Sequence, residues 1–330
     1  MPLLELDHVS HFYGTVCALN DVTLRIEPGT VGLIGQNGAG KSTLLKILLG
    51  LIQPTRGRSS VLGLDIRSRG MELRGRVGFM PESEALVPGL RGVDLVSLAG
   101  ELSGMPRKQA LRRAHEVLSY LGLEEARYRR CEEYSVGMKQ RLKLAAALVH
   151  DPEVLLLDEP TAGLDPDGRE AMLALLQSLA RRHGKSLVLS THLLGDVDRV
   201  CDQVLIIHRG VARGVGRIGE LRAQYRGRYK LQWRGDGAEF LKQLRTAGVT
   251  VQANGHSAGH SNGHGNSAFV ETPGDWSVRR FFELSCQSDL TLREVAPQEE
   301  DLEELYHRVI GTSVVAGDRP LAVEQNGSRE

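Results

Sequence analysis

The chain has 330 residues, long enough for one large folded core and a smaller second unit. Lysine plus arginine and aspartate plus glutamate each number 41, and aromatic residues make up only 5 %, so the chain lacks the basic surface and the stacking side chains of nucleic-acid-binding proteins. Widely spaced cysteines, no basic leader region and no long apolar window predict a cytoplasmic chain with no nucleic-acid partner, no signal peptide and no membrane span.

A phosphate-binding loop follows the first predicted strands. Short apolar runs predict strands over 3–9, 22–26 and 31–34, and a helical pattern runs from 43 to 49. Between the third strand and the helix, the sequence reads Gly-Gln-Asn-Gly-Ala-Gly-Lys-Ser, a complete GxxxxGK[ST] motif. The alternative is a glycine-rich turn without function. The strand before the motif and the helix after it favour a nucleoside-triphosphate site.

Each part of this loop has a physical role. Glycines allow several backbone N–H groups to surround an anion, and the following helix points its positive end at the same place. Lys41 is expected to reach the β- and γ-phosphates, and the Ser42 hydroxyl to bind Mg²⁺. The predicted nucleotide-binding residues of this region are Gly35, Gln36, Asn37, Gly38, Ala39, Gly40, Lys41, Ser42 and Thr43.

The middle of the chain alternates between helices and buried strands. After a strand over 76–80, residues 92–150 are mostly helical, with one amphipathic helix over 106–121. Wholly apolar strands, typical of a parallel sheet, are expected at 154–157, 187–189 and 204–207, with a helix over 169–183. This order predicts an α/β fold.

Two carboxylates end the apolar run at 154–157. Asp158 suits the Mg²⁺ position of a Walker B strand, and Glu159 points to the other side, where it could orient or deprotonate water. An acidic turn at the end of a strand is the alternative. The phosphate loop upstream favours the catalytic interpretation.

A change of composition after Gly227 indicates a second domain over 228–310. The predicted order is strand, helix (237–246), strands (249–253 and 268–272), helix (276–286), strand (290–296) and an acidic helix (299–310). This is the split βαβ order of a small α+β, ferredoxin-like domain. The last residues, 311–330, show no periodicity and are predicted to be disordered.

A histidine-rich turn lies between the two middle strands of this domain. Its three histidines could bind Zn²⁺, Ni²⁺ or Cu²⁺, since they are spaced four apart at 256, 260 and 264. Glycines between them make a stable helix unfavourable. We therefore predict a flexible hairpin loop without a bound metal.

The segment before the Asp158 strand carries a family resemblance. Residues 134–141 read Tyr-Ser-Val-Gly-Met-Lys-Gln-Arg, and here the chain resembles the nucleotide-binding subunit of ATP-binding cassette (ABC) transporters, whose signature is usually Leu-Ser-Gly-Gly-Gln. Ser135 and Gly137 match, and in the family they hold the γ-phosphate of ATP bound to the opposite subunit. Three positions depart from the pattern: Tyr134, Val136 and Met138.

Further motifs of that family occur in the expected order. Residues 162–165, Ala-Gly-Leu-Asp, resemble the loop that couples the two sites of the dimer through Asp165. The segment ending in His192 resembles the switch that contacts the γ-phosphate, and Tyr13 matches the aromatic that stacks on adenine. The family places Gln where this chain has Glu82, and we expect Glu82 to take that position beside Mg²⁺.

The resemblance covers residues 1–225, with a helical subdomain at about 83–150. It implies ATP and Mg²⁺ as cofactors, catalysis by Glu159, His192 and Lys41, and two copies that close around two ATP molecules. A permease on a separate chain would carry the substrate, contacting this chain near 82–95 at the cytoplasmic face of the membrane. The second domain is similar to extensions on export-type subunits, and the sequence does not name the cargo.

Two other functions fit the sequence less well than transport does. A cassette ATPase acting on ribosomes or DNA usually has two cassettes or long coiled-coil insertions, whereas this chain has one phosphate loop and no heptad stretch. A regulator with a degenerate site would not be expected to keep the four key side chains Lys41, Asp158, Glu159 and His192.

Overall fold

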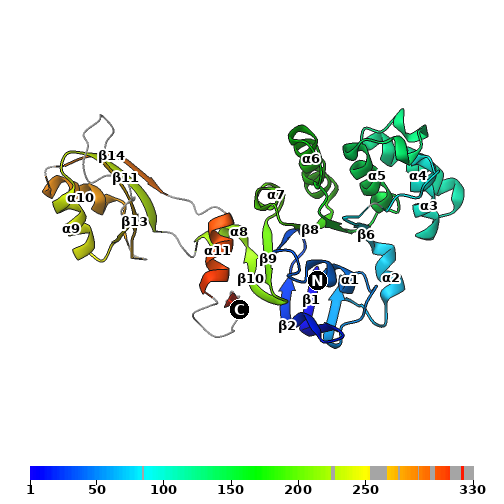
Figure 1. The fold of residues 1–330 in the computed structure, drawn as a ribbon, viewed down its shortest axis with the longest axis horizontal. Helices are drawn as coiled ribbons and strands as arrows, with labels where there is room; N and C mark the ends of the chain where they lie inside the picture. The colour runs from blue at the N-terminus through cyan, green and yellow to red at the C-terminus, as the bar shows by residue number, and fades with distance from the viewer. Residues whose placement is uncertain are drawn as a thin grey trace. The chain divides into compact units, whose positions relative to one another are not determined.

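The computed structural model describes residues 1–83, 85–223, 227–252, 266–273, 276–288, 290–297, 302–312 and 321–322. The chain forms two compact units (Figure 1). The first consists of Met1–Ile218 together with Tyr306–Glu330, and the second of Gly219–Leu305.

A seven-stranded sheet forms the centre of the first unit, in the order β15-β10-β9-β3-β8-β7-β6. Five neighbouring strands are parallel: β9 (Gln203–His208), β3 (Thr30–Ile34), β8 (Ser186–Thr191), β7 (Val154–Asp158) and β6 (Val77–Met80). Every residue of β3, β7 and β8 is buried, which explains their apolar sequences. Because these strands are parallel, the residues that follow them meet at one edge of the sheet.

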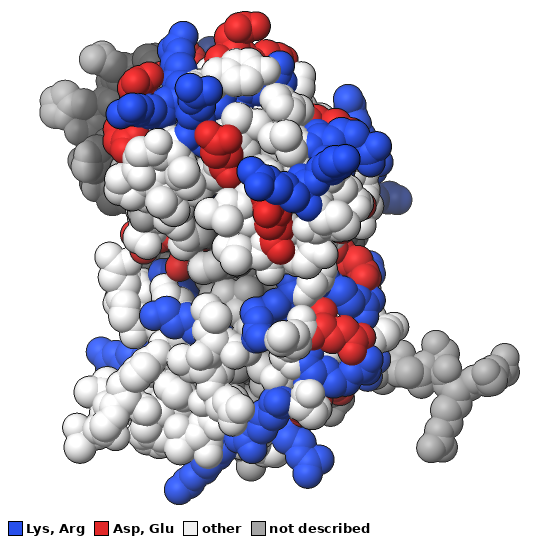
Figure 2. Space-filling view, turned by 90° about the vertical axis from the view of Figure 1, so that its right-hand side faces the viewer, with Lys and Arg blue, Asp and Glu red and all other residues white. Residues whose placement is uncertain are grey.

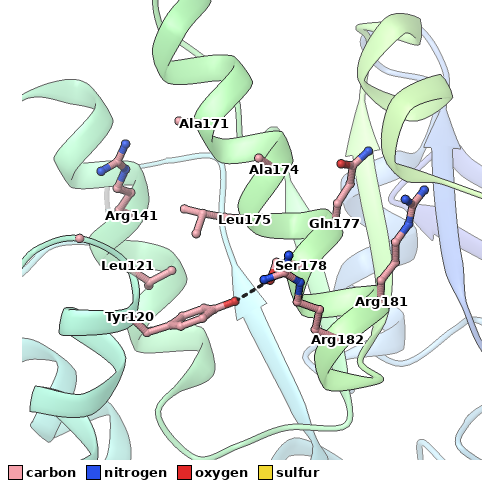
Figure 3. A pocket seen from close by; sticks show the side chains of 11 residues that line it. Tyr120, Leu121, Arg141, Ala171, Ala174, Leu175, Gln177, Ser178, Arg181 and Arg182 are labelled. Atoms are coloured by element: carbon pink, nitrogen blue, oxygen red, sulfur yellow. Dashed lines mark hydrogen bonds between the residues drawn. The ribbon is translucent and has the colours of Figure 1, made fainter.

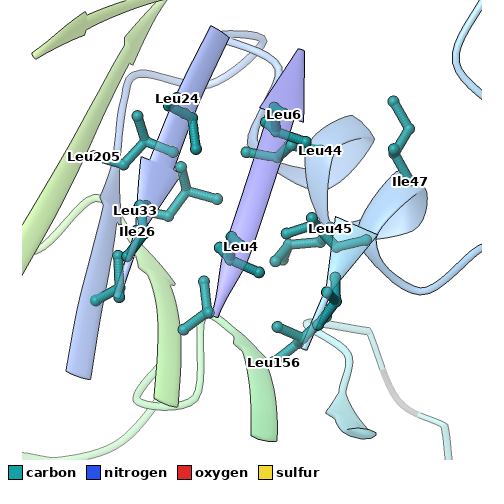
Figure 4. Packing of buried hydrophobic residues seen from close by; sticks show 14 of the residues in the cluster. Leu4, Leu6, Leu24, Ile26, Leu33, Leu44, Leu45, Ile47, Leu156 and Leu205 are labelled. Atoms are coloured by element: carbon teal, nitrogen blue, oxygen red, sulfur yellow. The ribbon is translucent and has the colours of Figure 1, made fainter. Parts of the chain in front are cut away.

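A second, antiparallel sheet in the order β2-β1-β4-β5 covers helix α1 (Lys41–Leu48). Its strands are β2 (Val16–Ile26), β1 (Leu4–Tyr13), β4 (Arg56–Val61) and β5 (Leu64–Asp65). Leucines of this sheet, of α1 and of the central sheet form one core (Figure 4). Leu44 and Leu45 are fully buried, and burial of each side chain stabilises the fold by about 1.5–3 kcal/mol. The loop between β3 and α1 is therefore anchored on both sides.

Helices surround the central sheet. They are α2 (Gly70–Arg76), α3 (Gly92–Leu102), α4 (Arg107–Tyr120), α5 (Val136–Leu148), α6 (Pro166–His183) and α7 (Leu194–Val200), with 3₁₀ turns at Ala126–Tyr128 and Cys131–Glu133. Helix α8 (Ile218–Ala223) begins at the last residue of this segment of the first unit and continues in the second unit. Tyr134 anchors the start of α5, because its buried hydroxyl donates to the Ala126 carbonyl at 2.7 Å. Burial raises the pKa of Tyr134 to about 12. The first departure from the family signature is thus a packing residue.

The second unit has the split βαβ arrangement that the sequence predicts. Its antiparallel sheet has the order β12-β13-β11-β14. The strands of the first half of the unit, β11 and β12, therefore alternate in the sheet with those of the second half, β13 and β14. The elements are β11 (Arg228–Arg234), α9 (Ala238–Thr246), β12 (Thr250–Gln252), β13 (Asn266–Glu271), α10 (Arg279–Gln287) and β14 (Thr291–Pro297). Phe240 and Phe281 from the helices pack on Leu231 and Trp233 of β11. The histidines at 256, 260 and 264 lie outside the described residues.

The end of the chain differs from the sequence prediction in two respects, which are the domain boundary expected at 225 and the disordered tail expected after 310. Helix α11 (Leu302–Thr312) begins in the second unit and ends in the first. Beyond it, β15 (Leu321–Ala322) pairs in parallel with Gly214 and Val215 of β10 (Val211–Arg217), so part of the predicted disordered tail is a strand. The strand forms because β10 is at the edge of the sheet, where its unpaired backbone groups can bind another strand. The local sequence pattern of the tail does not reveal this edge. Residues 313–320 and 323–330 lie outside the described residues.

The surface carries mixed charges. On the face drawn in Figure 2, basic side chains are scattered among acidic and uncharged ones and form no continuous stripe. Within the described part of the chain, every helix is too short or too polar to span a bilayer.

Candidate active site

The phosphate loop connects β3 to α1, and two of its glycines have backbone angles that favour glycine. Gly38 has φ 79° and Gly40 has φ 109°. A methyl group on Gly40 would lie 2.6 Å from the Ala18 carbonyl oxygen of β2, and one on Gly35 would collide with the Ile207 carbonyl of β9. The loop is pressed between these strands and leads directly into α1.

Replacement of Gly40 by alanine is expected to weaken ATP binding by about tenfold to a hundredfold. The alanine would have to occupy a left-handed conformation and displace the backbone of β2. Titration with a fluorescent ATP analogue measures the change. Gly75→Ala is the matched control, since a methyl group there meets open space. Unchanged affinity in Gly40→Ala would show that the loop geometry is not needed for binding.

Lys41 lies at the mouth of this loop and is 7 % exposed. Its Nζ donates to the Gly35 carbonyl at 2.6 Å and to the Gln36 carbonyl at 3.4 Å. An ammonium group held by two neutral carbonyls can exchange them for phosphate oxygens, with which it makes stronger, charge-assisted bonds. The ammonium group of Lys41 is therefore held at the phosphate loop, beside Gly35 and Gln36.

The two predicted Mg²⁺ ligands beside the loop lie together. The Ser42 hydroxyl donates to Asp158 Oδ2 at 3.3 Å, and the Ser190 hydroxyl donates to Asp158 Oδ1 at 2.8 Å. A hydroxyl and a carboxylate are the oxygen ligands that Mg²⁺ prefers, so this pair fits a Mg²⁺ ion that arrives with nucleotide. Ser190, which no sequence motif marks as a contact of Asp158, fixes the rotamer of that carboxylate.

Glu159 and His192 form a second pair at the same edge. Glu159 Oε1 accepts from the His192 backbone N–H at 3.1 Å and from its Nδ1 at 2.9 Å, while Oε2 accepts from the Thr191 hydroxyl at 3.1 Å. Glu159 is buried, and its φ of 47° is unusual for a side-chain-bearing residue. The carboxylate is thus fixed in direction, and the exposed imidazole extends outward from it.

Among the described residues, Glu82 makes no direct bond to Asp158. Pairing of Met80 with Leu157 places residue 82 beside the end of β7. The carboxylate is exposed and makes no hydrogen bond or ion pair with the described residues, while its backbone carbonyl accepts from Lys143 Nζ at 2.9 Å. Lys143 therefore holds this segment through a contact that no local sequence pattern indicates.

The remaining predicted residues lie on elements other than the phosphate loop. Ser135 and Asp165 are exposed helix caps: their side chains accept from Met138 N–H and Gly168 N–H, each at 3.3 Å. The Gly137 backbone faces Leu164, where a methyl group would be 3.7 Å away. Tyr13 is 46 % exposed at the β1–β2 turn, with its ring on the edge of His11. Among the described residues, the side chains of Ser135, Asp165 and Tyr13 make no bond to the loop.

Several contacts without a local sequence signal involve helix α5 and the segment after Glu159. Gln140 of α5 donates to the Ala162 carbonyl at 2.8 Å. Thr161 donates to Asp196 of α7 at 2.6 Å, and Arg169 of α6 binds the same carboxylate at 2.6 Å. Asp196 is fully buried. These residues link three helices behind the catalytic edge.

A groove of about 680 Å³ lies away from this site, between α6 and the ends of α4 and α5. Figure 3 shows Tyr120 reaching across it to Ser178, to which it donates a hydrogen bond at 3.2 Å. Its lining includes none of the predicted nucleotide-binding residues. The candidate site is instead an open surface, since Gln36, Asn37, Gly38 and Ser42 are exposed.

The chain is similar in sequence to members of a known family. A family model described as ABC transporter matches residues 19–162. The chain is 31 % identical over 310 residues to the uncharacterized ABC transporter ATP-binding protein YxlF of Bacillus subtilis, covering 93 % of this chain and 99 % of that one. It is 38 % identical over 213 residues to Nod factor export ATP-binding protein I of Burkholderia lata, covering 64 % and 70 %.

Solved structures give the same result for the first unit. The structure of an ATP-binding subunit of an ABC transporter has a TM-score of 0.61 at 32 % identity, covering 68 % of this chain and 93 % of that one. A dimeric ATP-binding cassette in a post-hydrolysis state, bound to ADP and phosphate, has a TM-score of 0.61 at 26 % identity, covering 65 % and 98 %. Similarity along nearly the whole of YxlF, together with the fold, establishes that the chain belongs to the ATP-binding subunits of ABC transporters and is an ATPase.

Proposed function

We propose that two copies of this chain close around two ATP molecules and drive export through a separate membrane permease. The observation that carries the proposal is the position of Ser135. It caps α5 with an exposed side chain and makes no bond to the phosphate loop of its own chain, so it is free to face the nucleotide of another copy. Exposure of the loop agrees with a site that a second copy completes.

In this proposal each side chain acts on ATP through charge and position. Lys41 binds the β- and γ-phosphates, and the ammonium stabilises negative charge as the γ-phosphoryl group leaves. Mg²⁺ would be held by Ser42 and Asp158, with Glu82 nearby, and neutralises phosphate charge when bound. Glu159 orients water and accepts its proton, while His192 contacts the γ-phosphate. Tyr13 stacks on adenine, and Asp165 couples the two sites.

A mixing experiment tests the composite site. Lys41→Ala removes the phosphate contact, and Ser135→Asp keeps the helix cap but places a negative charge against the γ-phosphate of the other copy. Each variant alone should be inactive. In a dimer of the two, one site carries both changes and the other is intact. Random pairing should therefore restore roughly a quarter of the wild-type ATPase rate. A mixture that stays inactive, or activity in Ser135→Asp alone, contradicts the proposal.

Export through a permease is the finer part of the proposal. Two relatives carry names of this kind, the Nod factor export protein and the bacitracin transport ATP-binding protein BcrA of Bacillus licheniformis, which is 34 % identical over 209 residues. We infer a location on the cytoplasmic face of the membrane, with permease contact near residues 82–95. Co-expression with a candidate permease should place the chain in the membrane fraction and make its ATPase activity respond to the permease. ATPase activity without membrane association would remove the transport role.

The Glu82 position makes its own prediction. A carboxylate close to Mg²⁺ strengthens metal binding, so Glu82→Gln is expected to raise the Mg²⁺ concentration for half-maximal ATPase activity by about threefold to tenfold. The measurement is ATPase rate against Mg²⁺ at fixed ATP. Glu124→Gln, an exposed carboxylate after α4, serves as the control. An unchanged Mg²⁺ dependence would remove Glu82 from the metal site.

A further inference from the structure

The groove between α6 and the ends of α4 and α5 is lined by positive charges that lack acidic partners. Arg141 extends from α5 on one side of the groove, and Arg181 and Arg182 extend from the end of α6 (Figure 3). Among the described residues, these three guanidinium groups form no ion pair and no carboxylate lines the groove. The other polar side chains of the lining are uncharged, namely Tyr120, Gln177 and Ser178. The groove therefore carries positive charge that its own walls do not neutralise.

Two helix ends explain why the arginines gather here. Arg181 and Arg182 lie in the last turn of α6, and a methyl group on Gly122, which follows α4, would be 3.4 Å from Arg141 Nη1. The carbonyl groups at a helix C-terminus attract an exposed cation by only about 0.3–1 kcal/mol. This attraction holds the side chains near the helix ends, but it is too weak to neutralise three guanidinium groups. Their charge remains available to another molecule.

The floor of the groove is a second stripe of small and apolar side chains on α6. Its members recur at helical spacing, and they are Ala171, Ala174, Leu175 and Ser178. The buried side of the same helix consists of other residues, namely Met172, Leu173, Leu176 and Leu179. Ala174 is exposed and Leu175 is half-buried, while Leu121 adds a buried apolar side chain at the end of α4. Alanines on this stripe let another helix approach α6 closely.

The dimensions of the groove favour one kind of occupant. From Ala171 to Arg182 the stripe runs for about three helical turns, or about 16 Å. A single phosphate ion would fill only a small part of a groove of about 680 Å³, and its arginines are exposed or half-buried. A flat lipid surface does not enter a groove between helices. A helix with an apolar stripe flanked by carboxylates matches both the apolar floor and the basic walls.

We propose that this groove is a docking site for an acidic amphipathic helix of a partner protein. The apolar side chains of that helix pack on the floor, and its carboxylates pair with the three arginines. The lining contains no residue of the ATP site and none of residues 82–95, at which permease contact is proposed. This docking site is therefore separate from both, and the proposal does not depend on either assignment.

A synthetic peptide tests the groove in the full chain. The probe is an alanine-based helix of about 18 residues, with leucines spaced three and four apart and glutamates on both sides of that stripe. Fluorescence anisotropy of the labelled peptide at low salt is expected to give a Kd on the order of 10–100 μM, which rises with salt. A control peptide with lysine in place of every glutamate should not bind.

Charge reversal then locates the binding. Arg181→Glu and Arg182→Glu should each raise the Kd by about threefold to tenfold, because an attraction becomes a repulsion. Ala174→Glu places a carboxylate on the floor and should raise it by about tenfold or more. Lys108→Glu, an exposed reversal on α4 outside the groove, should change the Kd by less than about twofold. All four variants should keep the Tm and the basal ATPase rate of the wild type, which shows that they are folded.

Three results would overturn the proposal. They are absence of binding at low salt, equal binding of the lysine peptide, and binding of the acidic peptide that none of the groove variants weakens. Vesicles containing phosphatidylglycerol and inorganic phosphate are tested in the same way. If either binds with a dependence on Arg182 and the acidic peptide does not compete, the groove accepts a lipid headgroup or free phosphate and not a helix.

Discussion

Replacement of Glu159 by glutamine is expected to lower steady-state ATP hydrolysis by about 10²–10⁴-fold while ATP still binds. The glutamine is nearly isosteric, so the loop, Lys41 and the Mg²⁺ pair stay in place. It can neither accept a proton from water nor accept from all three donors around it, namely the Thr191 hydroxyl and the two N–H groups of His192. Chemistry is therefore lost and binding is kept.

Phosphate release measures the rate, calorimetry with ATP measures affinity, and size-exclusion chromatography with Mg-ATP detects a trapped dimer. Glu101→Gln on α3 is the matched control, because that carboxylate is exposed and lies on a helix far along the chain from β7. Near-normal turnover in Glu159→Gln would mean that another group activates the water. Loss of both turnover and ATP binding would mean instead that the substitution had damaged the site.

Replacement of Arg169 by methionine is expected to lower the free energy of unfolding of the first unit by about 2–3 kcal/mol. Asp196 is fully buried, and Arg169 neutralises it through bonds of 2.6 Å from Nε and Nη2. Without the arginine, the buried carboxylate keeps one hydrogen bond from the described side chains, which is the bond from the Thr161 hydroxyl. The estimate lies below the range for a fully buried pair because the Arg169 side chain is 37 % exposed.

Urea denaturation of the nucleotide-free chain measures this loss. The double variant Arg169→Met with Asp196→Asn removes the stranded charge, so it should be destabilised by at least about 1 kcal/mol less than the sum of the single changes. Arg182→Met on the same helix is exposed and should have little effect. Strict additivity in the double variant would show that the two side chains do not depend on one another.

Local spacing predicted much of this site. The phosphate loop, Asp158 and Glu159 are each defined by neighbours in sequence, and parallel strands bring the ends of β3, β7 and β8 to one edge. The pairing of Glu159 with His192 follows from that topology. The sequence also predicted the buried, apolar strands and the split βαβ order of elements, because the spacing of apolar side chains and the order of elements are local signals.

The contacts between distant segments could not be predicted in the same way. Asp196 is an acidic residue in a short helix, and nothing in its neighbourhood indicates that it is buried against Arg169. Strand β10 contains two glycines and a polar pattern, so its pairing with β15 has no periodic signature. Tyr306 lies in an acidic helix whose apolar stripe indicates burial without saying against what.

The division of the chain has a consequence for protein engineering. The second unit is an insertion and not an appendage, because the chain leaves the first unit after Ile218 and returns to it at Tyr306. Cutting the chain near residue 225 removes the strand β15 and the end of α11 along with the accessory unit, so a truncated protein mixes two defects. An exchange of accessory units between relatives needs two junctions, at 218/219 and 305/306, and a single junction would transplant a piece of the ATPase as well.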